Sequence, residues 1–146
     1  MKEIKASIAI LLLLVSLSSC SDSNDNPSDT IEGNWRLVHV TGGILGVDQT
    51  FEGDKIIWKF NSQNQNLIVV DNNTDQNLID GLDSGSYEYS IISNPGNELC
   101  NQSIIIEDNG NMGCISIDNT KLTINDLSAD GFKYEFRRQE YNLLDI

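Results

Sequence analysis

Hydrophobic and polar residues alternate in short runs along most of this chain, from residue 31 onward. Ile56, Trp58 and Phe60, for example, would share one face of an extended segment, with Ile57 and Lys59 on the opposite face. A period of two is that of a β-strand with one buried face. The pattern predicts strands over residues 34–41, 55–61, 66–71, 86–92, 103–107, 113–118, 121–125 and 132–138.

The breaks between these runs indicate how the strands connect. They are short and rich in residues that favour turns, as in NPGN, DNGN and SADG. Short connections favour antiparallel pairing of sequential strands. No segment after residue 20 keeps a helical apolar period, and residues 74–83 could hold one helical turn at most. The sequence therefore predicts an all-β domain over residues 31–140, folded as an eight-stranded antiparallel up-and-down barrel, with a C-terminal tail over residues 141–146.

The N-terminus has the layout of an export signal. A positively charged start, MKEIK, precedes a largely apolar run over residues 8–17 that is too short to cross a bilayer. The next residues, Leu17-Ser18-Ser19-Cys20, resemble the lipobox of bacterial lipoproteins. The resemblance implies that residues 1–19 are a signal peptide and that Cys20 carries the lipid anchor. The alternative is an ordinary signal peptide with an incidental cysteine.

Residues 20–30 contain no large apolar side chain and predict a disordered tether between the lipid and the domain. Their acidic content resembles the export signals of some Bacteroidetes lipoproteins, which implies an outer-membrane location, on the periplasmic side or at the cell surface. The net charge of −13 disfavours nucleic acid, because an acidic surface repels phosphate. The expected partners are thus a membrane, through the N-terminal lipid, and no nucleic acid, while the oligomeric state stays open.

Cys100 and Cys114 are expected to form a disulfide, because an exported protein meets an oxidising compartment. A bridge that closes a loop of this length stabilises a fold by about 3 kcal/mol. A tight turn at residues 109–110, however, would set Cys114 opposite Ile105 and leave Cys100 about 16 Å away along the strand. The bridge therefore requires another register for this hairpin, or a chain that folds back before Ser103. Two free, buried thiols are the alternative.

The first predicted strand begins with Gly33-Asn34-Trp35, which resembles the G-x-W motif of lipocalins. In that family the tryptophan closes the base of an eight-stranded barrel, and an arginine from the last strand packs over its ring. The segment YEFRR supplies two arginines at the matching place. Alternation puts Arg138 on the face of Phe136 and Trp35, so Arg138 is the expected partner. A guanidinium over an indole contributes about 0.5–2 kcal/mol.

The resemblance covers about residues 31–140 and is closest to the lipocalin-like domains of Bacteroidetes lipoproteins. These domains often open with L-x-G-x-W-x-L and close with D-G-x-x-Y-x-F-x-R, and this chain has IEGNWRL and DGFKYEFR. Ile31 stands where the family has leucine. The T-D-Y motif of the better-known lipocalins is missing, so their small-molecule transport does not transfer directly to this chain.

Residues suited to catalysis or metal binding are few. His39 is the one histidine, and alternation from Trp35 points it into the barrel, where it either lines a pocket or serves as a hydrogen-bonded filler near the open end. The loop over residues 71–77 places Asp and Asn at alternate positions, but Gln76 stands where the calcium-binding EF-hand requires glycine. The chain also lacks the catalytic motifs of known enzyme classes. We therefore expect no metal site, no cofactor and no enzyme activity.

Inward-facing aromatic residues decide what the barrel can hold. Trp58, Tyr87, Tyr89 and Tyr134, together with His39, are the candidates for lining an apolar site, although we expect a largely packed interior with a shallow mouth. The first hypothesis is a lipid-anchored envelope protein that binds a small hydrophobic ligand in that mouth. The second is a scaffold that meets another protein or a glycan through its loops or outer face, with the barrel filled. An interior cavity of at least about 300 Å³ would favour the first.

Overall fold

The computed structural model describes residues 30–139, and within that range the chain forms nine β-strands and no helix. The strands are β1 (Gly33–Gly42), β2 (Val47–Thr50), β3 (Ile56–Asn61), β4 (Asn66–Asp71), β5 (Gly85–Ser93), β6 (Gln102–Ile106), β7 (Gly110–Asp118), β8 (Lys121–Asn125) and β9 (Phe132–Arg138). Every strand predicted from the alternation is present, as β1 and β3 to β9. The described residues include no helix that is long and apolar enough to cross a membrane.

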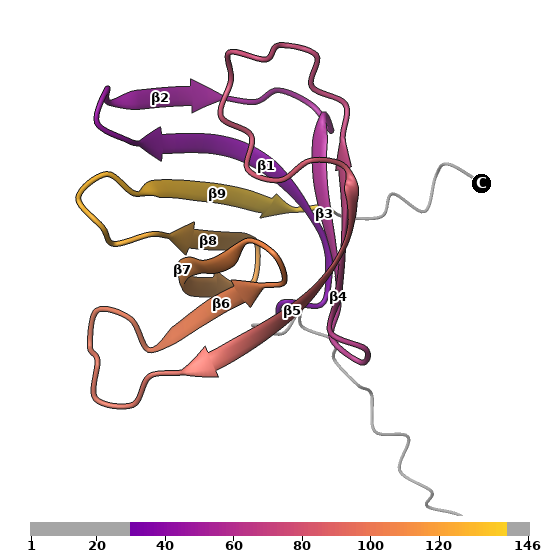
Figure 1. The fold of residues 1–146 in the computed structure, drawn as a ribbon. Helices are drawn as coiled ribbons and strands as arrows, with labels where there is room; N and C mark the ends of the chain where they lie inside the picture. The colour runs from indigo at the N-terminus through magenta and orange to yellow at the C-terminus, as the bar shows by residue number, and fades with distance from the viewer. Residues whose placement is uncertain (1–29, 140–146) are drawn as a thin grey trace, which may run out of the picture.

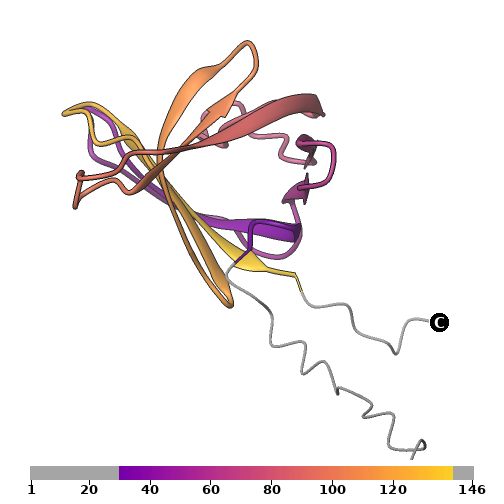
Figure 2. The same ribbon diagram turned by 90° about the horizontal axis from the view of Figure 1, so that it is seen from below.

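The strands close into a ring, which confirms the predicted barrel. β1 and β3 to β9 pair antiparallel in chain order, and β9 pairs back onto β1. The closing register places Leu37 opposite Phe136, while on its other edge β1 places Trp35 opposite Trp58. Figures 1 and 2 show β1, β9 and β8 forming one wall and β3, β4 and β5 forming another. Closure pairs β9 with β1, so the eight strands of the ring have a partner on both sides, while β2 pairs with β1 alone.

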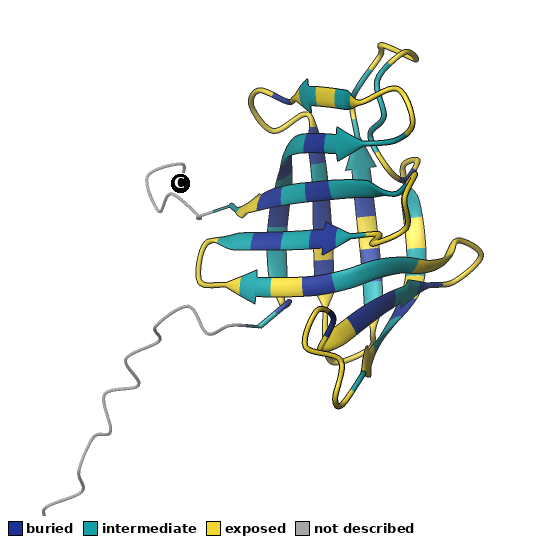
Figure 3. Ribbon diagram, turned by 90° about the vertical axis from the view of Figure 1, so that its left-hand side faces the viewer, coloured by how far each residue is buried: buried dark blue, intermediate teal, exposed yellow. Residues whose placement is uncertain are grey.

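The alternation of the sequence appears directly as alternation of burial. Figure 3 shows buried residues separated by half-buried and exposed ones along the strands. The interior is filled with large apolar side chains from both walls. The most completely buried of these are Trp35, Leu37, Val40, Ile56, Trp58, Leu67, Ile104, Ile106, Leu122, Ile124 and Phe136. Burial of this set excludes water from the barrel axis and supplies the main driving force for folding.

The strand β2 was not predicted. It pairs with the second half of β1, on the same edge where β3 pairs with the first half. β2 and β3 thus act as one partner strand of β1, interrupted near Phe51, whose amide donates to the Val38 carbonyl at 3.0 Å. The segment VDQT has a single apolar residue, so it lacks the pattern that identified the other strands.

A β-bulge in β1 overturns the prediction for His39. The pairing of β1 with β9 shifts between Leu37 and His39, so that His39 lies opposite Glu135 and Val40 lies opposite Tyr134. The extra residue at Val38 reverses the alternation for the rest of the strand. Val40 is therefore fully buried, and His39 lies on the outer face instead of in the barrel.

The disulfide between Cys100 and Cys114 is present, and both of the alternative departures from a simple hairpin occur together. A register shift in the β6–β7 hairpin places Ser103, rather than Ile105, opposite Cys114. The loop over residues 94–101 then folds back, since the Cys100 amide donates to the Asn97 carbonyl at 3.2 Å. These two features bring the Cα atoms of the cysteines to 5.3 Å, within disulfide reach.

Candidate functional site

One end of the barrel is sealed by Trp35 and Arg138. The Trp35 indole is fully buried, and its Nε1 donates to the Ile31 carbonyl at 2.7 Å. The Arg138 Cζ atom lies 4.1 Å from the centroid of the ring. The same guanidinium donates to the carbonyls of Thr30, Glu32 and Asn119 at 2.8, 2.7 and 3.0 Å. Partial burial lowers the pKa of Arg138. This end ties the start of β1 to the β7–β8 turn.

The geometry of the sealed end explains why the G-x-W motif has a glycine at residue 33. Gly33 has a φ of 113°, a conformation that other residues rarely adopt. A Cβ atom at this position would lie 3.1 Å from Nη1 of Arg138. Gly33 therefore allows the backbone to turn into β1 while the guanidinium approaches closely.

The opposite end of the barrel, the mouth, is covered by the loop between β4 and β5. We call residues 72–84 the plug loop. Figure 1 shows it extending from the ends of β4 and β5 toward β2. Its Leu82 is only 4% exposed, and Leu78 and Ile79 pack partly buried against the core. The barrel is thus closed at the mouth by irregular chain, in contrast to the strand residues that seal the other end.

The plug loop has the organisation of an Ω-loop, whose two ends lie close together and whose interior is packed by its own side chains. Its ends are joined by Ser84, whose Oγ accepts from the Asp71 amide at 2.8 Å and donates to the Asp71 carbonyl at 3.1 Å. Inside the loop, Asn73 Nδ2 donates to Asp80 Oδ2 at 2.8 Å. Its middle is fastened to β2 where the Ile79 amide donates to Oε1 of Gln49 at 2.8 Å.

Beneath the plug loop lies an aromatic cluster. The ring centroids of Trp58 and Phe136 are 4.9 Å apart, and those of Phe132 and Tyr134 are 6.4 Å apart. Burial is the main cause that raises the pKa of Tyr134, with smaller contributions from Asp80 and Asp126. A tyrosine phenol is neutral near pH 7 even at its ordinary pKa of about 10, so the floor of the mouth presents neutral aromatic surface.

Trp58 carries the one buried side-chain polar atom within residues 30–139 that has no hydrogen-bond partner, its Nε1. An unsatisfied buried donor costs about 1–3 kcal/mol. Such unsatisfied groups are rare in native structures, so this one requires an explanation. The donor lies inside the barrel, in a side chain that is 0% exposed.

The ligand candidates chosen from the sequence separate into three groups. Trp58 and Tyr134 both lie next to Gly81 of the plug loop. Tyr87 stands at the rim, where its hydroxyl donates to the Asp83 carbonyl at 2.9 Å. Tyr89 packs edge-on against Phe60 at 5.1 Å, away from these contacts.

His39 belongs to none of these groups, because it lies in a polar cluster on the outer face of β1, β8 and β9. Its Nε2 is 2.6 Å from Asp48 Oδ1, and its Nδ1 is 3.9 Å from Glu135 Oε2. Lys133 and Lys121 also pair with Glu135, and their hydrogen bonds lower the pKa of that carboxyl. These contacts are those of a structural ion-pair network, so His39 is not a ligand residue of the barrel interior.

Three surface hollows among the described residues bear on the choice of site. One of about 360 Å³ lies in the plug loop and is strongly acidic, with Asp71, Asn73, Asp75, Gln76, Leu78, Asp80 and Asp83 in its lining. Burial, with Asp80 and Asp83 nearby, raises the pKa of Asp71. Across residues 30–139, no group of three His, Cys, Asp or Glu side chains has an arrangement that could hold a metal ion.

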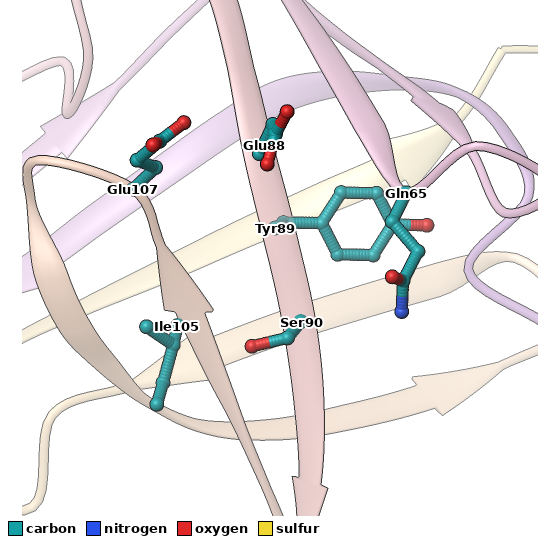
Figure 4. A pocket seen from close by; sticks show the side chains of 6 residues that line it. All are labelled: Gln65, Glu88, Tyr89, Ser90, Ile105 and Glu107. Atoms are coloured by element: carbon teal, nitrogen blue, oxygen red, sulfur yellow. The ribbon is translucent and has the colours of Figure 1, made fainter.

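The other two hollows lie over different strands, one at β5 and β6 and the other at β7 and β8. Figure 4 shows the one of about 260 Å³ between β5 and β6, where Glu88 and Glu107 stand near Tyr89 and Gln65. The last, about 300 Å³, lies beside the disulfide and is lined in part by Leu99 and Leu127. These two hollows lie outside the aromatic cluster of the mouth, because their linings share no residue with it.

The part of the site that sequence reasoning missed is the plug loop. The pattern treated residues 72–84 as a break between strands, although Leu78, Ile79 and Leu82 lie within it. The signal that could have found it is length, because irregular loops longer than about 12 residues inside a compact domain often serve as lids.

Comparison with protein-family models, with curated proteins and with solved structures found no match to this chain. What the fold itself defines is a class, the closed eight-stranded antiparallel up-and-down barrels, whose interiors serve small-ligand binding in many proteins.

Proposed function

We propose that this protein is a lipid-anchored, non-enzymatic binding protein of the cell envelope that takes a small apolar ligand at the mouth of a lipocalin-like barrel. The observation that carries the proposal is the construction of the mouth. An aromatic floor formed by Trp58, Tyr134 and Phe136 is roofed by irregular chain, the plug loop, and not by strands. Ligand sites in barrels are commonly apolar cavities at this position.

The contacts of the plug loop set the free energy that a ligand must overcome. Leu82, Leu78 and Ile79 already cover the floor with aliphatic side chains. An apolar ligand that replaces them gains burial of its own surface, while the plug side chains return to water, so binding is favourable when the ligand buries more apolar surface than the plug side chains lose. Each Å² of apolar surface removed from water contributes about 25 cal/mol.

The anchor rests on the sequence. Cys20, the signal peptide over residues 1–19 and most of the tether lie outside the residues that the structure describes. The proposal places the protein at the outer membrane because the lipobox-like LSSC follows a short apolar run and precedes an acidic linker. The single histidine is bound in an ion-pair network on the outer face, which supports binding rather than catalysis.

A second function, contact with another protein or a glycan through loops, is favoured by a separate observation. Apolar side chains at loop tips are exposed, with Leu45 at 94%, Leu99 at 85% and Ile44 at 81%. The glycine-flanked tip GGILG holds two of them at the end of the β1–β2 hairpin. The filled barrel would then serve as a scaffold, since exposed apolar groups of this kind mark interaction sites when they form a patch.

Native mass spectrometry of the protein extracted from its own membrane separates the two functions. Ligand binding predicts an added mass on the lipidated chain that disappears when the protein is denatured. The scaffold function predicts the mass of the lipidated chain alone, in both conditions. That second result, obtained with protein that retains its folded charge-state distribution, would remove the ligand proposal.

A further inference from the structure

The two tryptophans of the barrel differ in one informative way. Both are completely buried and face the interior from neighbouring strands. The Trp35 Nε1 donates to a backbone carbonyl, whereas the Trp58 Nε1 has no partner in the described part of the chain. Buried indole N–H groups usually find a hydrogen-bond acceptor. Trp58 therefore presents a buried donor that has no acceptor among the described residues.

The position of the plug loop indicates where that acceptor would lie. A Cβ atom placed on Gly81 would be 3.3 Å from Cζ2 of Trp58 and 3.4 Å from Cε1 of Tyr134. Cζ2 is bonded to the ring carbon that also carries Nε1, so the plug loop runs along the N–H edge of the indole. Gly81, with a φ of 98° and no side chain, keeps this edge free of a side-chain partner.

The middle of the plug loop also makes the fewest hydrogen bonds to the rest of the barrel. Its ends are tied by Ser84 to the backbone of Asp71. Between Asp75 and Leu82, the loop has one described hydrogen bond to the rest of the barrel, which the Ile79 amide donates to Gln49. Segments with few hydrogen bonds to their surroundings open more readily than strands, and the main cost of opening here is the exposure of Leu78, Ile79 and Leu82.

We propose that the middle of the plug loop lifts away from the mouth and that the ligand takes its place, with a neutral oxygen atom accepting the hydrogen bond of Trp58 Nε1. The inference rests on the proposed function and adds a ligand class to it. The ligand is an uncharged apolar molecule with one acceptor oxygen, such as a ketone, ester or alcohol.

The negative charge at the mouth favours an uncharged ligand over an anionic one. Asp71, Asp80 and Asp83 stand at the mouth around the acidic hollow of the plug loop. Lys55 is the cation that acts on this region, and it acts on Asp75 at the outer side of the loop. Lys121 and Lys133 are engaged with Glu135 on the outer face of the barrel. A carboxylate ligand would thus enter a field of like charge, which disfavours it.

Three competitors of similar chain length test this assignment. The neutral fluorophore N-phenyl-1-naphthylamine is bound to the intact protein and displaced with 2-decanone, decane or decanoate. We expect 2-decanone to compete about five- to tenfold more strongly than decane, which is the effect of one hydrogen bond. Decanoate is expected to be the weakest of the three near neutral pH.

Two variants locate the site. Trp58→Phe keeps an aromatic ring but removes the donor, so it should abolish the advantage of 2-decanone over decane, which is read as the ratio of the two affinities in the same variant. Gln49→Ala removes the bond to the plug loop and should strengthen binding of both molecules about two- to fivefold, because less free energy is needed to open the mouth. Gln63→Ala, on the β3–β4 turn at the sealed end, is the matched control and should change neither.

The outcomes separate the two levels of the proposal. If neither the fluorophore nor 2-decanone binds the folded wild-type protein, the ligand function and this inference both fail. If they bind but Trp58→Phe retains the full preference for 2-decanone, or if decanoate competes as well as the ketone, ligand binding stands and the assignment to Trp58 is overturned. Because Gln49 lies on β2, its variant tests the plug loop even if Trp58→Phe does not fold.

Discussion

Gly33, Trp35 and Arg138 act together at the sealed end of the barrel, and each constrains the other two. The guanidinium covers the indole at 4.1 Å and at the same time satisfies three backbone carbonyls. Lysine cannot make this set of contacts, because it lacks the planar fork of donors. The arginine therefore serves as a clamp that holds the chain entering β1 against the turn before β8.

Replacing Arg138 by alanine tests this clamp. We expect the free energy of unfolding to fall by about 2–4 kcal/mol, because the cation–π contact and several charge-assisted hydrogen bonds are lost together. Urea unfolding followed by fluorescence measures the change. Arg137→Ala is the control, since Arg137 is exposed on the neighbouring position and should change stability by less than about 0.5 kcal/mol. Equal effects of the two variants would contradict the clamp.

Glu135 makes stability depend on pH. Hydrogen bonds from Lys133 and Lys121 hold its pKa below the ordinary value of 4.5 in the folded protein. A carboxyl whose folded pKa is depressed contributes stability above its unfolded pKa, and that contribution is lost as the pH falls through the folded pKa.

Glu135→Gln should therefore lower the free energy of unfolding near pH 7 by about 1–2 kcal/mol. The difference from wild type should shrink as the pH falls below about 4. Denaturation curves at several pH values check this expectation. Glu107→Gln, an exposed carboxylate on the β6–β7 turn, should show no such convergence. A difference for Glu135→Gln that stays constant with pH would be inconsistent with the ion-pair network.

At the scale of elements, the β5–β6 loop and the β6–β7 hairpin depend on each other. The loop over residues 94–101 returns to the outer face of the sheet only because the shifted register brings Cys114 opposite Ser103. Asn94 Nδ2 then donates to Ser103 Oγ at 2.6 Å beneath the loop. The disulfide therefore fastens a loop whose own backbone hydrogen bonds are few.

Removal of the bridge by the double substitution Cys100→Ser and Cys114→Ser should lower the free energy of unfolding by about 3 kcal/mol, as expected for a loop of this length. Chemical denaturation of both proteins, with and without reductant, measures the effect. Reductant should destabilise the wild-type protein and leave the double variant unchanged. A wild-type curve that reductant does not move would contradict a structural disulfide.

The plug loop is the element on which the mouth depends. Leu82→Ala should lower the free energy of unfolding by about 2–4 kcal/mol, because the leucine is only 4% exposed and its truncation leaves a cavity over the aromatic floor. Leu99→Ala is the matched control, as Leu99 is 85% exposed and should cost less than about 0.5 kcal/mol. If Leu82→Ala is as neutral as Leu99→Ala in calorimetry, the plug loop does not seal the barrel.

At the scale of the whole molecule, Thr30 and the mouth lie on opposite sides of the barrel. The described chain begins at Thr30 beside the sealed end, where Arg138 Nη2 donates to its carbonyl. β1 runs from there toward the β1–β2 turn, so that turn and the mouth lie away from the entry point of the tether. An anchor at Cys20 would thus attach the protein by its sealed end and leave the mouth open to incoming ligands.

The anchor is tested in cells. The wild-type chain should fractionate with the membrane, and globomycin, which blocks lipoprotein signal cleavage, should cause the longer precursor to accumulate. Cys20→Ala should abolish membrane retention of a processed chain, because it removes the only attachment point for the lipid. A wild-type protein that is processed normally in globomycin and recovered in the aqueous fraction would refute the lipid anchor.

Sequence reasoning performed differently on regular and irregular parts of the molecule. Trp58, Phe60, Tyr134 and Phe136 were placed inward correctly because each lies in a strand whose alternation continues without interruption. His39 was placed wrongly because the pattern was extrapolated across Val38, where the strand bulges. A bulge depends on the pairing of two distant strands, and no residue type near Val38 predicts it.

The sequence by itself determined eight of the strands and their antiparallel order, because one-sided burial imposes a local period of two that can be read along the chain. The seal of Trp35 by an arginine followed from the resemblance to the lipocalin motif, and alternation selected Arg138. Only the tertiary structure decided the outward position of His39, the addition of β2, the register that joins Cys100 to Cys114, and the closure of the mouth by the plug loop. These features arise from contacts between segments far apart in the chain. Their free energy depends on how two surfaces meet, which a one-dimensional pattern does not contain.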